Sequence, residues 1–341
     1  KAANYQLPTI SNSPVVTITQ ATQAAITFTS ALTTIFGQNI TISATGGTGT
    51  GALTFATSSG ACQVASSILT PVSAGSCVVV ATRAADTNYL AQTASQTVSI
   101  AYADQAAVSF SSASTVEYGT NLTLGAQGGS GTGAYEFAKV SGNCTLSGAT
   151  LTPTAVGDCV VKTRRAGDSG YNVSAWSADT TITITKKPLT VVVTPTPSSR
   201  EYNGSTTVTL GTLTAANLTG VVGSDVVTVD NSKISATVAD ATVGVNKAVT
   251  TVISTGFLGG TNAGNYFEPT VSNSPTLTIT LATQGTVSMT SATTFVYGSS
   301  LTLTASGGNG TGAYEYSVVS GNCSVTGDAL TASAVDTCVV K

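Results

Sequence analysis

Apolar and polar residues alternate along much of this chain. Segments such as Ile40–Ala44 (ITISA), Leu122–Ala126 (LTLGA) and Leu301–Ala305 (LTLTA) place an apolar side chain at every second position. A period of two is typical of a strand with one buried face. The more continuous apolar run Cys77–Arg83 (CVVVATR) favours a central strand instead. No segment shows a clear 3.6-residue period, so the pattern predicts an all-β protein.

The strands belong to an internal repeat. Ile40–Phe55, Leu122–Phe137 and Leu301–Tyr316 carry one pattern, and each copy contains a glycine-rich stretch that supplies turn residues between two strands. The second copy begins 82 positions after the first, and the third begins 179 positions after the second. A module of another type therefore lies between the second and third copies. About 80 residues of short, regularly spaced strands fit a β-sandwich of immunoglobulin size.

Short linkers, at residues 101–105 and 185–188, join the modules. Because short linkers limit bending, we expect tandem immunoglobulin-like antiparallel β-sandwich domains arranged as a rod. The predicted segments are 1–23, the end of a module of the second type; 24–105 (module 1) and 106–185 (module 2), both with a cysteine pair; 186–284 (module 3), without cysteine; and 285–341 (module 4), a truncated module with a cysteine pair.

The six cysteines share one spacing. The partners of each pair lie fifteen positions apart: Cys62 and Cys77, Cys144 and Cys159, Cys323 and Cys338. A bond that closes such a loop contributes about 3 kcal/mol on the chain-entropy model. Metal ligation is the alternative, but no CxxC spacing and no histidine accompany the pairs. We therefore expect three disulfides, which persist in oxidising compartments and imply an extracellular location.

Composition excludes several classes of function. Charged residues make up 8% of the chain, and the 12 lysines and arginines are scattered, with doublets only at Arg164–Arg165 and Lys186–Lys187. Nucleic-acid binding relies on clustered basic residues, so we expect no nucleic-acid partner. No apolar run reaches 18 residues, so no membrane span is predicted. With no histidine and no nucleophile beside a base, we expect no enzyme, cofactor or catalytic residue.

Two features of the repeat have a chemical and a structural interpretation. The GGTGTG stretch at 46–51 lacks the Lys-Ser/Thr ending of a phosphate-binding loop, which favours a hairpin turn. Asp86 and Asp168 precede Tyr89 and Tyr171 at the same module position. Either aspartate could supply one ligand of a calcium site, but acids are sparse, and an Asx turn is the preferred interpretation. The tyrosines could hold a loop as a tyrosine corner does.

Module 3 resembles a known repeat. Tyr202-Asn203-Gly204 stands where the YDG-type repeat of very large bacterial surface proteins has Tyr-Asp-Gly, and Asn262–Tyr266 (NAGNY) is similar to that family's closing segment. The cysteine modules resemble bacterial immunoglobulin-like repeats in their GxC frame and their RAGDxxY-like turn. Together these resemblances cover nearly the whole chain and imply an extracellular adhesin or surface fibre. They do not imply a ligand.

The two ends of the chain cut through modules. Asn4–Gln23 copies Asn265–Gln284, so the chain begins within the last strands of a YDG-like module. Module 4 stops at Lys341, before the strand that residues 180–185 form in module 2. We interpret the sequence as a window on a longer array. The alternative is that a neighbouring subunit donates the strand.

These observations predict the structural repeat region of a giant extracellular surface protein that acts as a semi-rigid stalk or fibre. One alternative is a self-assembling extracellular filament subunit joined by strand donation. Another is an adhesin that binds glycan or protein through loops or through the tyrosine-rich segments Gly133–Phe137 and Gly312–Tyr316. The expected partners are neighbouring repeats of the same chain or identical chains, with a surface glycan or protein as a possible ligand.

Overall fold

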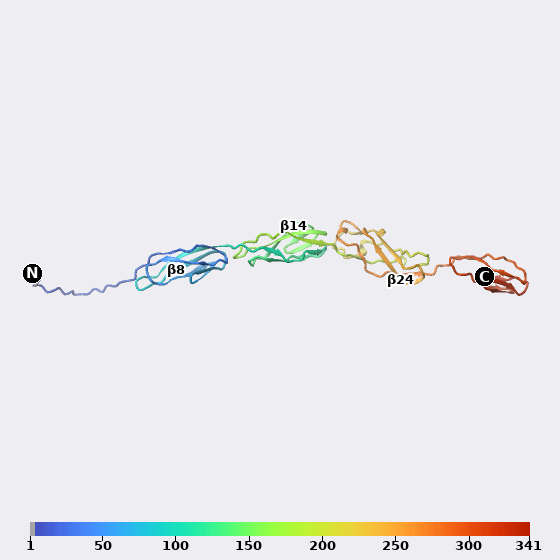
Figure 1. Cartoon of the computed structure of the whole chain (residues 1–341), viewed down its shortest axis with the longest axis horizontal. Helices are drawn as coiled ribbons and strands as arrows, with labels where there is room; N and C mark the ends of the chain where they lie inside the picture. The colour runs from blue at the N-terminus through green and yellow to red at the C-terminus, as the bar shows by residue number, and fades with distance from the viewer. Residues whose placement is uncertain (1–3) are drawn as a thin grey trace. The chain divides into compact units, whose positions relative to one another are not determined.

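The computed structural model describes residues 4–341, and strands dominate that part of the chain (Figure 1). The helical elements among these residues are single 3-10 turns: η2 (Ala215–Asn217), η3 (Asn231–Lys233) and η4 (Ala263–Asn265). The all-β prediction is confirmed. Within the described residues, no helix has the length and apolar character needed to cross a bilayer.

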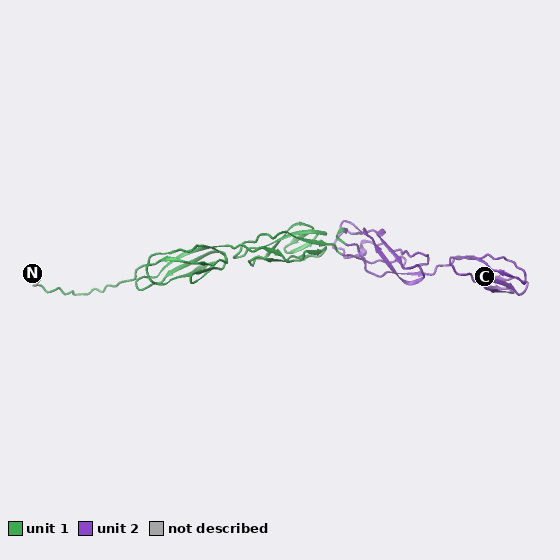
Figure 2. Cartoon of the chain, in the orientation of Figure 1, with its two compact units in different colours: residues 1–187, 264–266 green, residues 188–263, 267–341 purple. Residues whose placement is uncertain are grey.

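The chain divides into two compact units (Figure 2). Unit 1 contains the residues up to Lys187 together with Gly264–Tyr266. Unit 2 contains Pro188–Ala263 and Phe267–Lys341. Three residues of module 3 therefore belong, by their contacts, to the unit that holds modules 1 and 2.

Module 1 is a two-layer sandwich. Its strands are β1 (Ile26–Phe28), β2 (Thr33–Ile35), β3 (Ile40–Thr41), β4 (Ala44–Gly46), β5 (Leu53–Gly60), β6 (Cys62–Ala65), β7 (Ile68–Pro71), β8 (Gly75–Arg83) and β9 (Gln92–Ala101). One sheet has the order β2-β9-β8-β5, the other has the order β3-β7-β6, and β1 pairs with β4. The apolar run at Cys77–Arg83 lies in β8, an interior strand of the larger sheet, as the sequence predicts.

Module 2 repeats this topology. Its strands are β10 (Val108–Phe110), β11 (Thr115–Glu117), β12 (Leu122–Thr123), β13 (Ala126–Gly128), β14 (Tyr135–Gly142), β15 (Cys144–Ser147), β16 (Thr150–Pro153), β17 (Gly157–Arg165) and β18 (Thr180–Thr185). The sheets have the orders β11-β18-β17-β14 and β12-β16-β15, with β10 paired to β13. Even the irregularity recurs, because a shift of register falls after Thr57 in module 1 and after Lys139 in module 2.

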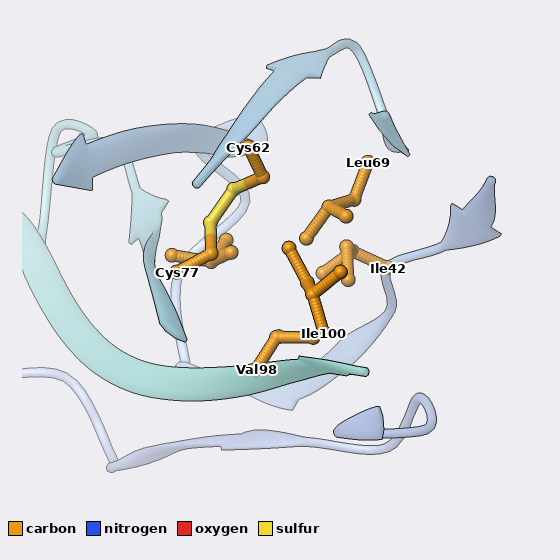
Figure 3. Packing of buried hydrophobic residues seen from close by; sticks show 7 residues of the cluster. Ile42, Cys62, Leu69, Cys77, Val98 and Ile100 are labelled. Carbon is orange, nitrogen blue, oxygen red and sulfur yellow. A yellow bond between two sulfur atoms is a disulfide. The ribbon is translucent and has the colours of Figure 1, made fainter. Parts of the chain in front are cut away.

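Side chains from both sheets of module 1 meet in one core. Val79 in β8 and Val98 and Ile100 in β9 pack with Leu69 in β7 and with the buried pair Cys62 and Cys77. Figure 3 shows this pair joined beside Val98, with Ile100 and Leu69 directed into the same space. The disulfide therefore links the two layers and contributes apolar surface to the core.

Unit 2 contains most of module 3 and all of module 4. The module 3 strands are β19 (Thr190–Val191), β20 (Ser199–Glu201), β21 (Leu218–Thr219), β22 (Thr228–Val229), β23 (Ile234–Val238), β24 (Gly244–Ile253), β25 (Leu258–Gly259), β26 (Thr270–Val271) and β27 (Thr276–Thr280). The sheets are β20-β27-β24-β23, β21-β19-β26 and β22-β25. A core of Val208, Ala236, Val238, Val249, Leu277 and Ile279 lies within this module.

Module 4 repeats part of the cysteine-module pattern. Its strands are β28 (Val287–Met289), β29 (Ser300–Thr302), β30 (Ala305–Gly307), β31 (Val318–Ser320), β32 (Cys323–Thr326), β33 (Ala329–Ala332) and β34 (Val339–Val340). They form the sheets β29-β33-β32, β28-β30 and β31-β34.

Two features of the sheets differ from the sequence-based expectation. The alternating segment Ile40–Ala44 forms two strands rather than one, because β3 pairs with β7 and β4 pairs with β1. The pairing is also not purely antiparallel. In modules 1, 2 and 3 an early strand runs parallel to the last strand: β2 with β9, β11 with β18 and β20 with β27.

Candidate functional site

The boundary between modules 1 and 2 contains a specific aromatic contact, which we call joint 1. Phe36 directly follows β2, and its backbone N–H donates to the Ala101 carbonyl at 2.9 Å. Its ring packs edge-on against Tyr171 of module 2, with 5.3 Å between ring centroids and 81° between ring planes. Edge-to-face pairs of this kind contribute about 0.5–1.5 kcal/mol beyond the burial of their surface. The contact therefore stabilises one relative position of the two modules within unit 1.

The linker adds backbone contacts to joint 1. Ala103 forms a parallel bridge with Tyr171: its N–H donates to the Gly170 carbonyl, and its own carbonyl accepts from the Asn172 N–H, both at 2.9 Å. The Ala74 N–H of module 1 donates to the Ser169 carbonyl of module 2 at 2.7 Å. A side chain at position 170 would collide with the Phe36 ring, so glycine allows this close approach.

An aspartate holds the loop that carries the tyrosine. Asp168 Oδ1 accepts from the N–H groups of Gly170 and Tyr171, both at 2.9 Å, and its Oδ2 accepts from the Thr132 N–H at 2.6 Å. The N–H donations of Thr132 and Gly170 are the main reason that the pKa of Asp168 falls from 3.8 to about 2. Asp86 makes the matching bonds in module 1, and its pKa is also lowered, chiefly by the Asn88 N–H.

A glutamine joins the linker to the module that follows it. Gln105 Nε2 donates to the Ala166 carbonyl at 2.9 Å and to the Asn172 carbonyl at 2.8 Å, on either side of Tyr171. Gln23 does the same in module 1, where it is buried and donates to the carbonyls of Ala84 and Leu90. The linker therefore binds the tyrosine loop through a side chain as well as through its backbone.

Joint 2 lies between module 2 and the loop Gly264–Tyr266, all within unit 1. Tyr118, the residue after β11, packs edge-on against Tyr266 at 5.6 Å and 90°. Both rings are buried, with exposed fractions of 5% and 2%. Lys187 bridges to Tyr266, and its N–H donates to the Asn265 carbonyl at 3.0 Å.

Joint 2 also contains side-chain bonds of its own. The Val156 N–H, whose counterpart in module 1 is Ala74, donates to Asn265 Oδ1 at 3.0 Å. Asn265 is only 8% exposed. Lys187 Nζ forms an ion pair with Glu117 at 3.0 Å, and both side chains are partly exposed. The joint is thus built from an aromatic pair, a buried amide and a charge pair.

The structure places the predicted site residues as follows. Asp86 and Asp168 form the expected Asx turns, because each accepts from N–H groups two and three residues ahead. Tyr171 packs against the neighbouring module, a role that its own module's pattern does not predict. Within residues 4–341, no three His, Cys, Asp or Glu side chains gather in a way that could hold a metal ion.

Each cysteine pair lies inside one module. Cα–Cα distances are 5.7 Å for the two pairs in modules 1 and 2 and 6.1 Å for the pair in module 4. The first cysteine of each pair begins a four-residue strand of a three-stranded sheet: β6, β15 or β32. The residues joined are Cys62 to Cys77, Cys144 to Cys159 and Cys323 to Cys338.

The YNG motif of module 3 follows β20 and forms a compact turn. Asn203 Oδ1 accepts from Arg200 Nη1 at 2.6 Å and from the Ser205 N–H at 3.1 Å. An amide oxygen therefore accepts these bonds at the position where the YDG-type repeat has an aspartate. Gly204 has a φ of 73°, a left-handed conformation that favours glycine. Tyr202 N–H donates to the Thr280 carbonyl at 2.9 Å, the same bond that Phe36 and Tyr118 make in their modules.

This motif lies within a stretch that a family model identifies. Residues 185–274 match the YDG domain. The resemblance of module 3 to the YDG-type repeat is therefore confirmed. The match ends at residue 274, so it includes both the Tyr202-Asn203-Gly204 turn and the loop Gly264–Tyr266 of joint 2.

The chain is similar to several solved structures at low sequence identity. Domains 4 and 5 of the S-layer protein SbsC are 16% identical, with 48% of this chain and 99% of that chain covered and a TM-score of 0.20. Drosophila N-cadherin EC1-4 is 11% identical, with 84% and 85% covered and a TM-score of 0.21. A SusE-like, surface-located polysaccharide-binding protein of Bacteroides thetaiotaomicron is 12% identical, with 63% and 41% covered and a TM-score of 0.19. No curated protein sequence matches the chain.

Sequence reasoning did not identify the joint residues. Phe36, Tyr118 and Tyr202 occupy one position of the modules, and Gln23 and Gln105 occupy another. A sequence signal exists in the aromatic-glycine pairs Phe36-Gly37 and Tyr118-Gly119, and in Gln105, which lies four residues after the end of β9. This signal can be recognised only when the parallel pairing of an early strand with the last strand is known.

Proposed function

We propose that this chain is a non-enzymatic, load-bearing segment of an extracellular surface protein, in which docked β-sandwiches act as a semi-rigid stalk or fibre. The observation that carries the proposal is the parallel pairing of an early strand with the last strand in three successive modules. The proposed partners are the neighbouring modules themselves.

The strand geometry supports resistance to tension. In module 1, tension enters near β2 and leaves through the end of β9, and the two strands run parallel. The two strands are therefore pulled in opposite directions along their own axes. All the hydrogen bonds between them are then loaded together, whereas strands pulled apart sideways lose their bonds one after another. The joints extend this arrangement, because Phe36 and Tyr118 directly follow the loaded strands.

The disulfides support both the location and the mechanical role. Disulfides persist in oxidising environments such as the cell surface. Each bridge spans 15 residues and joins strands of the two layers, so a module that unfolds under tension keeps that loop closed. The extension gained on unfolding is therefore limited.

Single-molecule force spectroscopy on the full chain tests this proposal. We expect separate unfolding events for modules 1 and 2. Reduction should lengthen each of these events by about 50 Å, because 15 residues at about 3.5 Å each are released from a Cα–Cα distance of 5.7 Å. The Cys62→Ser/Cys77→Ser variant should show the longer event in module 1 without reduction. Smooth extension with no resolved events would contradict the load-bearing role.

A surface on module 2 supports ligand binding as a second candidate function. Arg164 lies over the ring of Trp176 at 4.5 Å, Lys162 lies over the same ring at 5.2 Å, and Glu136 pairs with Arg164 at 2.7 Å. Module 1 has Val80 and Thr82 where module 2 has the two cations. An exposed indole with adjacent cations suits an acidic sugar, which stacks its ring and pairs its carboxylate.

Binding of polygalacturonate to the full chain tests this second function. Binding that disappears in both Trp176→Ala and Arg164→Ala, and that weakens at high salt, would establish it. Equal binding by the parent and by both variants would rule it out. The tyrosine-rich segments are weaker candidates, because the Tyr135 and Tyr314 hydroxyls already donate to the carbonyls of Gly128 and Gly307.

A further inference from the structure

The tyrosine of the YDG domain occupies the position of a joint aromatic. Phe36, Tyr118 and Tyr202 each follow the strand that runs parallel to the last strand of the module, and each N–H donates to that last strand at 2.9 Å. Two of these rings pack against a tyrosine of the next module. Tyr202 does not, and its exposed fraction is 48%, compared with 5% for Tyr118.

A cavity of about 480 Å³ lies beside Tyr202, within unit 2. Its lining includes Tyr202, Asn203, Val243, Ala282, Asn309 and Gly310. One wall therefore comes from the YNG turn, and another comes from the linker and from the glycine-rich turn of module 4. In joint 1 the corresponding elements are the turn after β2, the linker at Ala103 and the glycine-rich turn of module 2.

Backbone groups around this cavity match those that bind the tyrosine loop in joint 1. Ala282 corresponds to Ala103, whose N–H and carbonyl both bond to the loop. Thr311 corresponds to Thr132, whose N–H donates to Asp168. Within residues 4–341, neither Ala282 nor the Thr311 N–H makes a hydrogen bond.

The linker glutamine of this cavity, Gln284, forms hydrogen bonds through its amide oxygen. Gln284 Oε1 accepts from the N–H groups of Asn309 at 2.8 Å and Gly310 at 3.0 Å, so it already holds the glycine-rich turn in place. The Nε2 of Gln105 donates to the carbonyls that flank Tyr171, whereas Gln284 Nε2 has no hydrogen-bond partner in the described part of the chain. Gln284 Nε2 is therefore available to donate to a loop of the same type as the one that Gln105 binds.

We propose that this cavity is the seat for an Asp-x-x-Tyr loop of the module that follows the YDG domain, and that Tyr202 is its aromatic docking residue. The loop is of the type seen at Asp86–Tyr89 and Asp168–Tyr171. Its aspartate binds the Thr311 N–H, its tyrosine bridges to Ala282 and packs on Tyr202, and its flanking carbonyls accept from Gln284. The inference rests on the proposed role of the joints and assigns a partner to the tyrosine of the YDG motif.

An extended chain tests the inference. Cys338–Lys341 (CVVK) repeats Cys159–Lys162, so the sequence of residues 163–185 can be attached after Lys341 in the same frame. Hydroxyl-radical labelling then reports the exposure of each tyrosine. Docking should slow the labelling of Tyr202 by roughly tenfold, the ratio of the 48% exposure of Tyr202 to the 5% exposure of Tyr118. The same extension with Tyr171→Ala in the copied segment should leave Tyr202 labelled as fast as in the unextended chain.

A second variant keeps the test valid if the extended module 4 does not fold. Residues 285–341 are replaced by a copy of residues 106–185, which form a complete sandwich in the structure. Protection of Tyr202 in either chain, lost with Tyr171→Ala in the copied segment, supports the seat. Unchanged labelling of Tyr202 in both chains, with Tyr118 still protected, overturns this inference and leaves joint 2 intact. Rapid labelling of Tyr118 in the parent chain would instead contradict the joints on which the proposed function rests.

Discussion

Joints 1 and 2 use the same positions of the module repeat with different chemistry. Joint 1 combines a half-buried aromatic pair with a backbone bond from Ala74 to the Ser169 carbonyl. Joint 2 buries both rings, directs the Val156 N–H to the Asn265 side chain and adds an ion pair. The position of the contact is therefore set by the parallel strands, which both modules share. The strength of the contact, and its response to acid and salt, are set by a few side chains that differ between joint 1 and joint 2.

The largest expected difference concerns the aromatic residues. Tyr118→Ala should lower the free energy of unfolding by about 3–5 kcal/mol, because it removes a buried ring and leaves a cavity. Phe36→Ala should lower the free energy of unfolding by about 1–2 kcal/mol, because the ring is only partly buried. Native-state hydrogen exchange at β11 and β2 measures the two costs in one chain. Equal losses would show that burial does not distinguish the joints, and Tyr118→Phe serves as the control that keeps the ring.

The amide of Asn265 provides the next comparison. Asn265→Ala leaves the partly buried Val156 N–H without its acceptor, which should lower the free energy of unfolding by about 1–3 kcal/mol. Ser169→Ala is the matched control in joint 1, because the Ser169 backbone carbonyl accepts the bond and remains after the substitution. Denaturant unfolding of unit 1 should therefore respond to the first variant and not to the second. A similar response to both would mean that the amide does not stabilise joint 2 through this bond.

Acid should loosen the tyrosine loop of joint 1 in a defined range. The pKa of Asp168 is 3.8 ordinarily and about 2 in the folded chain, so its contribution is complete above about pH 4 and is lost as the pH falls toward 2. Exposure of Tyr171, followed by tyrosine labelling between pH 5 and pH 2, should rise over this range. Asp168→Asn should remove the dependence. A parent chain whose Tyr171 exposure stays constant to pH 2 would contradict this role.

The smallest expected effect distinguishes the joints by their response to salt. Glu117 and Lys187 are partly exposed, so their ion pair should contribute about 0.2–1 kcal/mol and weaken as salt is added. Joint 1 has Ile35 and Ala103 at these positions and should not respond. Hydrogen exchange of the parent and of Glu117→Gln at low and high salt checks this. A salt effect that persists in Glu117→Gln would assign it to other charges.

The sequence by itself determined the class of fold, the repeat and the approximate location of many strands. Alternation at Leu122–Ala126 and the apolar run at Cys77–Arg83 are local patterns, because side chains on a strand point alternately to opposite faces. The Asx turns at Asp86 and Asp168 were also predictable, since the N–H groups that form each turn lie two and three residues after the aspartate. Such features depend on neighbours along the chain.

Only the tertiary structure decided how these strands pair and where the modules touch. Ile40–Ala44 alternates without interruption, yet its two halves join different partners, because pairing depends on the strands that surround them. Phe36 and Tyr171 are 135 positions apart in sequence, and nothing near either residue specifies the other. Their contact arises because the parallel pairing places Phe36 at the end of its module, where the linker holds the next tyrosine loop. A contact between distant segments follows from the fold as a whole, which local sequence patterns do not encode.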